Sequence, residues 1–101
     1  MRDGRPALVR QHERMTPPGL LAAWLRERGI PFEVVPSWDG APAPDPLRYR
    51  FVASLGSPYG PNDTHEPAVA EELRLIERAV EEGVPVLGLC FGGEALSAVL
   101  G

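Results

Sequence analysis

The sequence has little of several features that mark whole classes of protein. It contains one cysteine in 101 residues, so it can build neither an internal disulfide nor a zinc site of paired cysteines. It shows no basic patch of the kind found in nucleic-acid-binding proteins, and its formal net charge is −4. Its most apolar run, residues 84–93, is too short to span a bilayer. We therefore expect no nucleic-acid partner, no membrane partner and no metal site.

The residues that are present fit one small globular domain. The chain is 44% hydrophobic and 24% charged, and 101 residues is an ordinary length for a single domain. Its 11 glycines and 12 prolines form no repeat, which excludes collagen. No apolar leader follows Met1, which favours a cytoplasmic location.

Short apolar runs alternate with helical patterns along the chain. The pattern predicts strands at 7–9, 30–35, 49–54 and 84–89, and helices at 18–28, 67–82 and 94–100. The order β-α-β-β-α-β-α is typical of an α/β protein with a mostly parallel sheet and flanking helices. The nearly continuous apolar run 84–89 suits a strand buried on both faces. Residues 10–14 are predicted to form a polar loop, and Thr64 or His65 to cap the second helix.

The single cysteine lies where a predicted strand passes directly into a predicted helix. Cys90 stands in the run GLCFG, with a glycine two residues away on either side. Such a strand-to-helix turn is typical of a nucleophile elbow. At the start of a helix, the dipole and free amides favour a thiolate, and the amide of Phe91 could hold an oxyanion. The alternative is a buried cysteine in a glycine-rich turn.

A second turn follows the third predicted strand, in the run LGSP at 55–58. It would present backbone amides at the end of a neighbouring strand, where sites of parallel α/β sheets lie. Taken alone, an ordinary turn explains it better.

The two runs together resemble class I glutamine amidotransferases. GLCFGGE at 88–94 is similar to that family's Gly-x-Cys-x-Gly-x-Gln nucleophile motif, and LGSP at 55–58 to its Gly-Gly-Pro oxyanion loop. The helix and strand of 71–89 have the family's pattern too. Order and register agree over nearly all of the chain. The resemblance implies a flavodoxin-like α/β fold and identifies residues 1–101 as a single, truncated domain, the N-terminal half of the family's domain.

The resemblance also implies a reaction and its residues. Cys90 would attack the side-chain amide of glutamine, or of a γ-glutamyl compound, and release ammonia through a thioester. The amides of Ser57 and Phe91 would stabilise the oxyanion, while Gly56 and Glu94 would bind the substrate. The resemblance implies no cofactor. It implies a synthetase as the partner that receives the ammonia.

The sequence departs from the family pattern at three points. Ser57 stands where a glycine is common, and Glu94 where glutamine is usual. The family's catalytic histidine, with its glutamate or aspartate, belongs to a later segment. The two histidines here, His12 and His65, are each better explained as solvated loop residues than as a general base.

These departures leave a second reading open, an inactive amidotransferase-like interaction domain or gene fragment. A flavodoxin-like binding module is a weaker third, because no Gly-x-Gly-x-x-Gly follows the first strand. We expect the apolar strand 84–89 to leave one sheet edge and one face bare. A complementary C-terminal fragment, or a second copy of the chain in a homodimer, would cover them.

Overall fold

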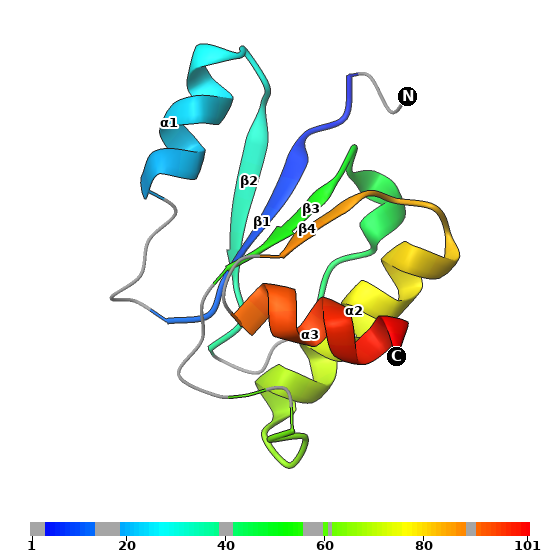
Figure 1. Cartoon of the computed structure of the whole chain (residues 1–101). Coiled ribbons are helices and arrows are strands. Elements are labelled where there is room, and N and C mark those ends of the chain that lie inside the picture. Colours follow the sequence, from blue (N-terminus) through cyan, green and yellow to red (C-terminus); the bar gives the residue numbers. More distant parts are fainter. Residues whose placement is uncertain (1–3, 14–18, 39–41, 56–59, 61, 89–90) are drawn as a thin grey trace.

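The computed structural model describes residues 4–13, 19–38, 42–55, 60, 62–88 and 91–101, with residues 91–94 described by their backbone alone. Strands and helices alternate in the predicted order (Figure 1). Their bounds are β1 Ala7–Gln11, α1 Gly19–Glu27, β2 Phe32–Pro36, the 3-10 helix η1 Pro46–Arg48, β3 Val52–Ser54, α2 Pro67–Glu81, β4 Val86–Gly88 and α3 Phe91–Leu100.

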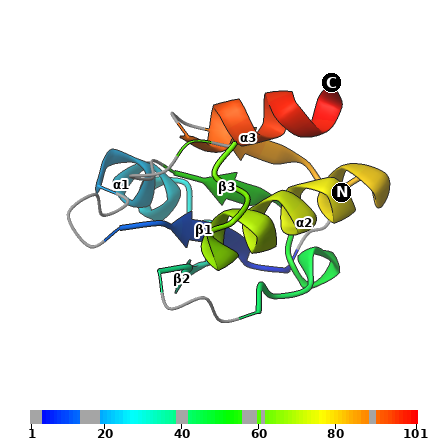
Figure 2. The ribbon, with the colours of Figure 1, turned by 90° about the horizontal axis from the view of Figure 1, so that it is seen from below.

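The strands form one four-stranded parallel sheet in the order β2-β1-β3-β4. Helix α1 covers one face over β1 and β2, and α2 and α3 cover the other (Figures 1 and 2). Because all four strands run the same way, their carboxyl ends meet at one edge of the sheet. Sites of parallel α/β proteins lie at that edge. The predicted fold class is confirmed.

Alternation of side chains along the strands builds a core on each face of the sheet. On the α2 face, Leu8 and Val52 pack with Leu75 and Ala79. On the α1 face, Val9 packs with two buried leucines, Leu25 and Leu55. A third cluster joins α2 to α3 through Val69, Ile76 and Ala95.

Two helices end at glycines, as the sequence predicts. Gly29 after α1 and Gly83 after α2 have φ values of +67° and +72°. Only glycine adopts this left-handed conformation without steric cost. The chain then turns back at once, with Ile30 N donating to Leu25 O at 2.9 Å and Val84 N to Ala79 O at 2.8 Å.

Three local predictions differ from the structure. The expected loop at 10–14 is wrong at its start, because β1 continues through Arg10 to Gln11. Glu66, rather than Thr64 or His65, precedes α2, without a capping side-chain hydrogen bond. Helix α3 begins at Phe91 instead of residue 94. The 3-10 helix η1 lies in the connection between β2 and β3, and the Asp45 carboxylate before it accepts from Leu47 N.

Strand β4 lies at one edge of the sheet formed by the described residues. The side chain of Leu87 is 44% exposed, whereas Val86 packs against α2 and α3. The strand is therefore covered on one face only, and the prediction of burial on both faces is wrong for the described chain. The bare edge and face expected from the sequence are present.

Candidate functional site

The two runs that carry the predicted chemistry follow neighbouring strands. Strands β3 and β4 pair in parallel, with Ser54 opposite Gly88. The chain leaves both strands at the same edge of the sheet, towards residues 56–57 and 89–90. Gly56, Ser57 and Cys90 lie outside the described residues.

The surroundings of Cys90 have the architecture that a nucleophile elbow needs. Strand β4 ends at Gly88, and α3 begins at Phe91, the residue directly after Cys90. Phe91 and Glu94 both fall in the first turn of α3, as part of its described backbone. A strand-to-helix connection of this length is the structural context in which the motif carries chemistry.

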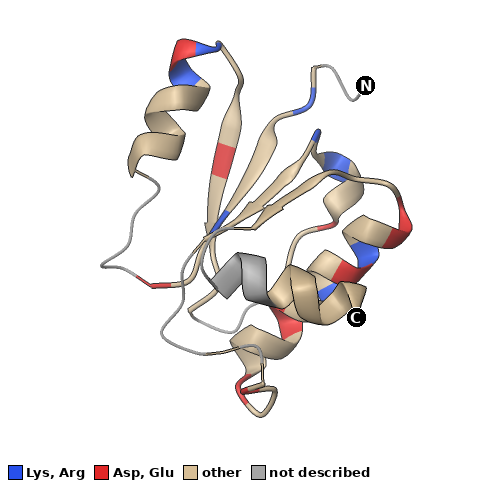
Figure 3. Cartoon of the chain, in the orientation of Figure 1, with Lys and Arg blue, Asp and Glu red and all other residues tan. Residues whose placement is uncertain are grey.

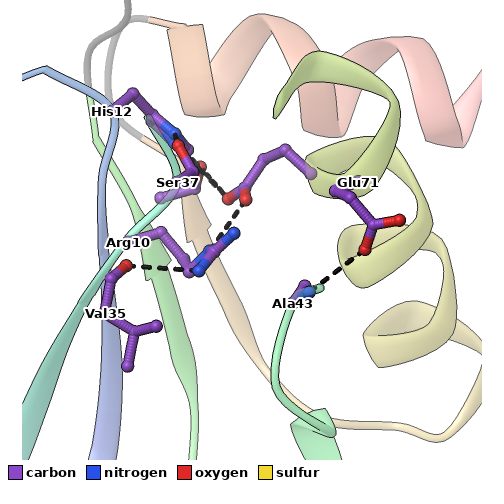
Figure 4. Close-up of polar contacts among 8 residues, drawn as sticks. Arg10, His12, Val35, Ser37, Ala43 and Glu71 are labelled. Carbon is purple, nitrogen blue, oxygen red and sulfur yellow. Dashed lines mark hydrogen bonds and ion pairs between the residues drawn. The ribbon is translucent and has the colours of Figure 1, made fainter. Parts of the chain in front are cut away.

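Next to this edge lies a buried polar cluster that sequence reasoning missed. Its members come from the ends of three strands and from α2: Arg10 and His12 from β1 and the residue after it, Ser37 after β2, Ser54 in β3 and Glu72 in α2. All five are buried, and His12 is the most exposed of them at 6%. Figure 4 shows Arg10, His12 and Ser37 pointing into the layer between the strands and α2.

An ion pair forms one end of the polar cluster. Arg10 Nε donates to Glu72 Oε1 at 2.9 Å, and both side chains are at most 1% exposed. Arg10 Nη1 also donates to the carbonyl of Val35 at 3.2 Å (Figure 4). Arg10 Nη2 is buried and has no hydrogen-bond partner among the described residues.

A chain of hydroxyl and imidazole groups forms the other end. Ser54 Oγ donates to Glu72 Oε2 at 2.7 Å, and His12 Nε2 lies 2.9 Å from Ser54 Oγ. His12 Nδ1 lies 2.6 Å from Ser37 Oγ. Because Ser54 gives its proton to the carboxylate, its oxygen accepts from His12 Nε2–H. Nδ1 pairs with the Ser37 hydroxyl, as an acceptor in the neutral ring and as a donor in the protonated ring.

The polar cluster holds Glu72 in its ionised form. Burial alone would raise the pKa of Glu72. The imidazole of His12, whose Nε2 lies 3.4 Å from Glu72 Oε2, the charge of Arg10 and the hydrogen bond from Ser54 together outweigh burial and lower that pKa below its ordinary value of 4.5. The buried carboxylate therefore stays charged and paired with Arg10.

The two histidines behave differently from one another. His65 has a side chain 75% exposed and lies 3.6 Å from the Glu66 carboxylate, which agrees with a solvated loop residue. The same prediction for His12 is wrong, because His12 is buried against two serines. One signal in the sequence pointed to this cluster: Glu72 lies between Val69 and Ile76 on the apolar side of α2, where a charge needs a buried partner.

Figure 3 marks the charged residues along the ribbon, and several of them lie on α1 and α2. On α2, Arg74, Glu77, Arg78 and Glu81 are exposed. Within the described ranges no group of three or more His, Cys, Asp or Glu side chains could hold a metal ion. No helix in that part of the chain has the length and apolar character needed to cross a membrane.

Comparison with known sequences finds glutamine-hydrolysing GMP synthases. The chain is 33% identical over 82 residues to that of Rhodopseudomonas palustris and 34% identical over 82 residues to that of Bartonella quintana. The matched region covers 81% of this chain in both cases, but only 14% and 15% of the relatives. A comparison with models of known protein families finds no match.

Comparison of folds finds glutamine amidotransferases of known structure. The one from Methylobacillus flagellatus superposes with a TM-score of 0.87 at 32% identity, and the one from Thermotoga maritima with 0.86 at 28%. Each superposition covers 96% of this chain, and 39% and 43% of the solved chains respectively. The chain thus spans about two fifths of the length of the solved proteins that it matches.

Proposed function

We propose that this chain, which is related by sequence and by fold to the class I glutamine amidotransferases, forms part of a glutaminase site with Cys90 as its nucleophile. One observation carries the proposal. The parallel pairing of β3 with β4 brings the carboxyl ends of two strands side by side, and each strand leads into one of the two family-like runs. Residues 1–101 would then form one portion of an amidotransferase domain.

The reaction follows from thiol chemistry. The Cys90 thiolate attacks the carbon of the glutamine side-chain amide, and a sulfur–carbon bond forms as the carbonyl oxygen takes the negative charge. The backbone amides of Ser57 and Phe91 would stabilise that charge, while Gly56 and Glu94 contact the substrate. The carbon–nitrogen bond breaks, the nitrogen takes up a proton and leaves as ammonia, and water hydrolyses the thioester to glutamate. No cofactor takes part in these steps.

A second polypeptide would complete the site. Neither histidine in the described structure is free to serve as the general base, since His12 has a serine hydroxyl at each ring nitrogen and His65 lies beside Glu66 at the surface. The exposed edge of β4, with Leu87 at 44% exposure, offers the place for an added strand. We propose that a complementary fragment or a second copy of this chain docks there, that a synthetase receives the ammonia, and that the assembly works in the cytoplasm.

A second candidate function is an amidotransferase-like interaction domain without catalysis. The engagement of both histidines favours it, as do Ser57 and Glu94 in place of the family's glycine and glutamine. An anionic Glu94 four residues from Cys90 would disfavour the thiolate.

Covalent labelling separates the two functions. The purified chain is treated with a diazo-ketone analogue of glutamine, and the intact mass is measured with and without competing glutamine. Because Cys90 is the single cysteine, one adduct that is absent in Cys90→Ser and suppressed by glutamine supports the glutaminase. A folded chain that gives no adduct, either alone or with the polypeptide that completes its site, while iodoacetamide still alkylates Cys90, contradicts it and favours the interaction domain.

A further inference from the structure

The buried polar cluster lies next to the sheet edge at which β3 and β4 lead into the two runs of the proposed site. Ser54 is the last residue of β3 and stands two positions before Gly56, the first residue of the predicted oxyanion turn. It is also paired in register with Gly88, which stands two positions before Cys90. Ser54 therefore lies next to both halves of the proposed site. Its own strand leads into the oxyanion turn, and the strand paired with it leads into the nucleophile run.

We propose that Ser54, held between His12 and Glu72, is a positioning residue that fixes the end of β3 and so aligns the oxyanion turn with the nucleophile. This role rests on the proposed glutaminase function. The residue acts through the backbone and touches neither substrate nor thiol.

The hydrogen bonds at Ser54 explain how one hydroxyl can fix a strand end. Ser54 Oγ donates to Glu72 Oε2 on α2 at 2.7 Å and accepts from His12 Nε2 at 2.9 Å. These two bonds leave the side chain one orientation, and they tie β3 to two other elements at once. His12 is itself fixed by Ser37 at 2.6 Å, which extends the chain of bonds to the end of β2.

The next residue is fixed on the opposite face of the sheet. Leu55 N donates to Arg10 O at 3.1 Å, and the Leu55 side chain packs against Val9 and Leu25. The last two described residues before the turn are therefore held from both faces, one by hydrogen bonds and one by apolar contacts. The described end of β3 is therefore fixed as far as Leu55.

Stability alone does not explain a polar cluster at this place. A buried ion pair contributes little more to folding than apolar residues of the same size would. Hydrogen bonds fix the orientation of a group more strictly than apolar packing does, because they weaken steeply away from their preferred angle. Catalysis needs that directionality, since a displacement of about 1 Å can cost about 100-fold in rate.

The test compares labelling kinetics of Cys90 in Ser54→Ala and wild type, with the glutamine analogue varied to separate kinact from KI. We expect kinact to fall by at least about tenfold, within the range that small displacements produce, and KI to stay unchanged. Ser97→Ala, at an exposed position of α3, is the matched control for the substitution. Ile76→Val, in the cluster between α2 and α3, controls for lost stability, because it costs about 0.5–1.5 kcal/mol without touching Ser54.

The possible outcomes separate the positioning role of Ser54 from the glutaminase function. Wild-type kinetics in a labelled Ser54→Ala chain overturn the positioning role and leave the glutaminase function intact. An equal loss in Ile76→Val shows that labelling follows stability, which also overturns it. A wild-type chain that is not labelled, either alone or with the polypeptide that completes its site, removes the glutaminase function and the positioning role with it. If Ser54→Ala does not fold, Ser37→Ala replaces it: its kinact should fall by about threefold, and a wild-type value overturns the proposal.

Discussion

Replacing the buried carboxylate of α2 should reveal how strongly the polar cluster holds the fold together. The substitution Glu72→Gln keeps the size of the side chain and removes its charge. Arg10 then keeps a buried guanidinium, whose Nη2 already has no hydrogen-bond partner among the described residues, and loses its counter-charge. The new amide group can accept from Arg10 or from Ser54, but its NH2 group faces the other donor.

The expected cost follows from the depth of the pair. Arg10 and Glu72 are 1% and 0% exposed, so water cannot replace the lost partner. Removing one member of such a pair costs about 3–5 kcal/mol in the free energy of unfolding. A domain of this length has about 5–15 kcal/mol in total, so the loss is a large share of the whole. Glu77→Gln, exposed on the same helix, should change the free energy by less than about 0.5 kcal/mol.

Urea unfolding followed by tryptophan fluorescence measures both variants. A double-mutant cycle with Arg10→Met isolates the ion pair, and we expect a coupling energy of at least about 1 kcal/mol between the two positions. A Glu72→Gln chain that unfolds at the wild-type urea midpoint would refute the reasoning, because the carboxylate would then not be paired in the folded protein. A coupling energy near zero would refute it equally.

Two further predictions concern pH and association. Because the pKa of folded Glu72 lies below its ordinary value of 4.5, its stabilisation is complete above that pH and is lost as the pH falls through the lowered pKa. The urea midpoints of wild type and Glu72→Gln should therefore converge on acidification, and a constant gap would contradict this. Leu87→Glu should reduce self-association in light scattering, whereas Leu20→Glu on α1 should not; equal masses for both would exclude the β4 edge as the contact.

The order of the elements could be predicted because it depends on local signals. Apolar runs gave the strands, and Gly29 and Gly83 stopped the helices where predicted. The context of the cysteine motif followed from the same signals, since β4 and α3 flank residues 89–90. The strand bounds differ by a few residues, as the ends of elements usually do.

The polar cluster could not be predicted because none of its bonds is local. Arg10 and His12 follow a short apolar run and resemble a loop. Glu72, the partner of Arg10, lies 62 positions further along the chain. Only the parallel sheet brings β1, β3 and α2 together. The sequence alone shows that Glu72 lies on the apolar face of a helix. The structure is needed to show that Arg10 is its ion-pair partner.

Successive side chains of β1 point to opposite faces of the sheet, and the polar cluster therefore also disfavours one kind of misfolding. Sliding β1 by one residue against β3 would turn Arg10 towards α1, into the apolar group of Val9, Leu25 and Leu55. A guanidinium there would meet no carboxylate among the described residues of that group and would stay buried without its counter-charge. Arg10, the only buried arginine among the described residues, therefore makes a one-residue shift of β1 costly, because the shift would separate its guanidinium from Glu72.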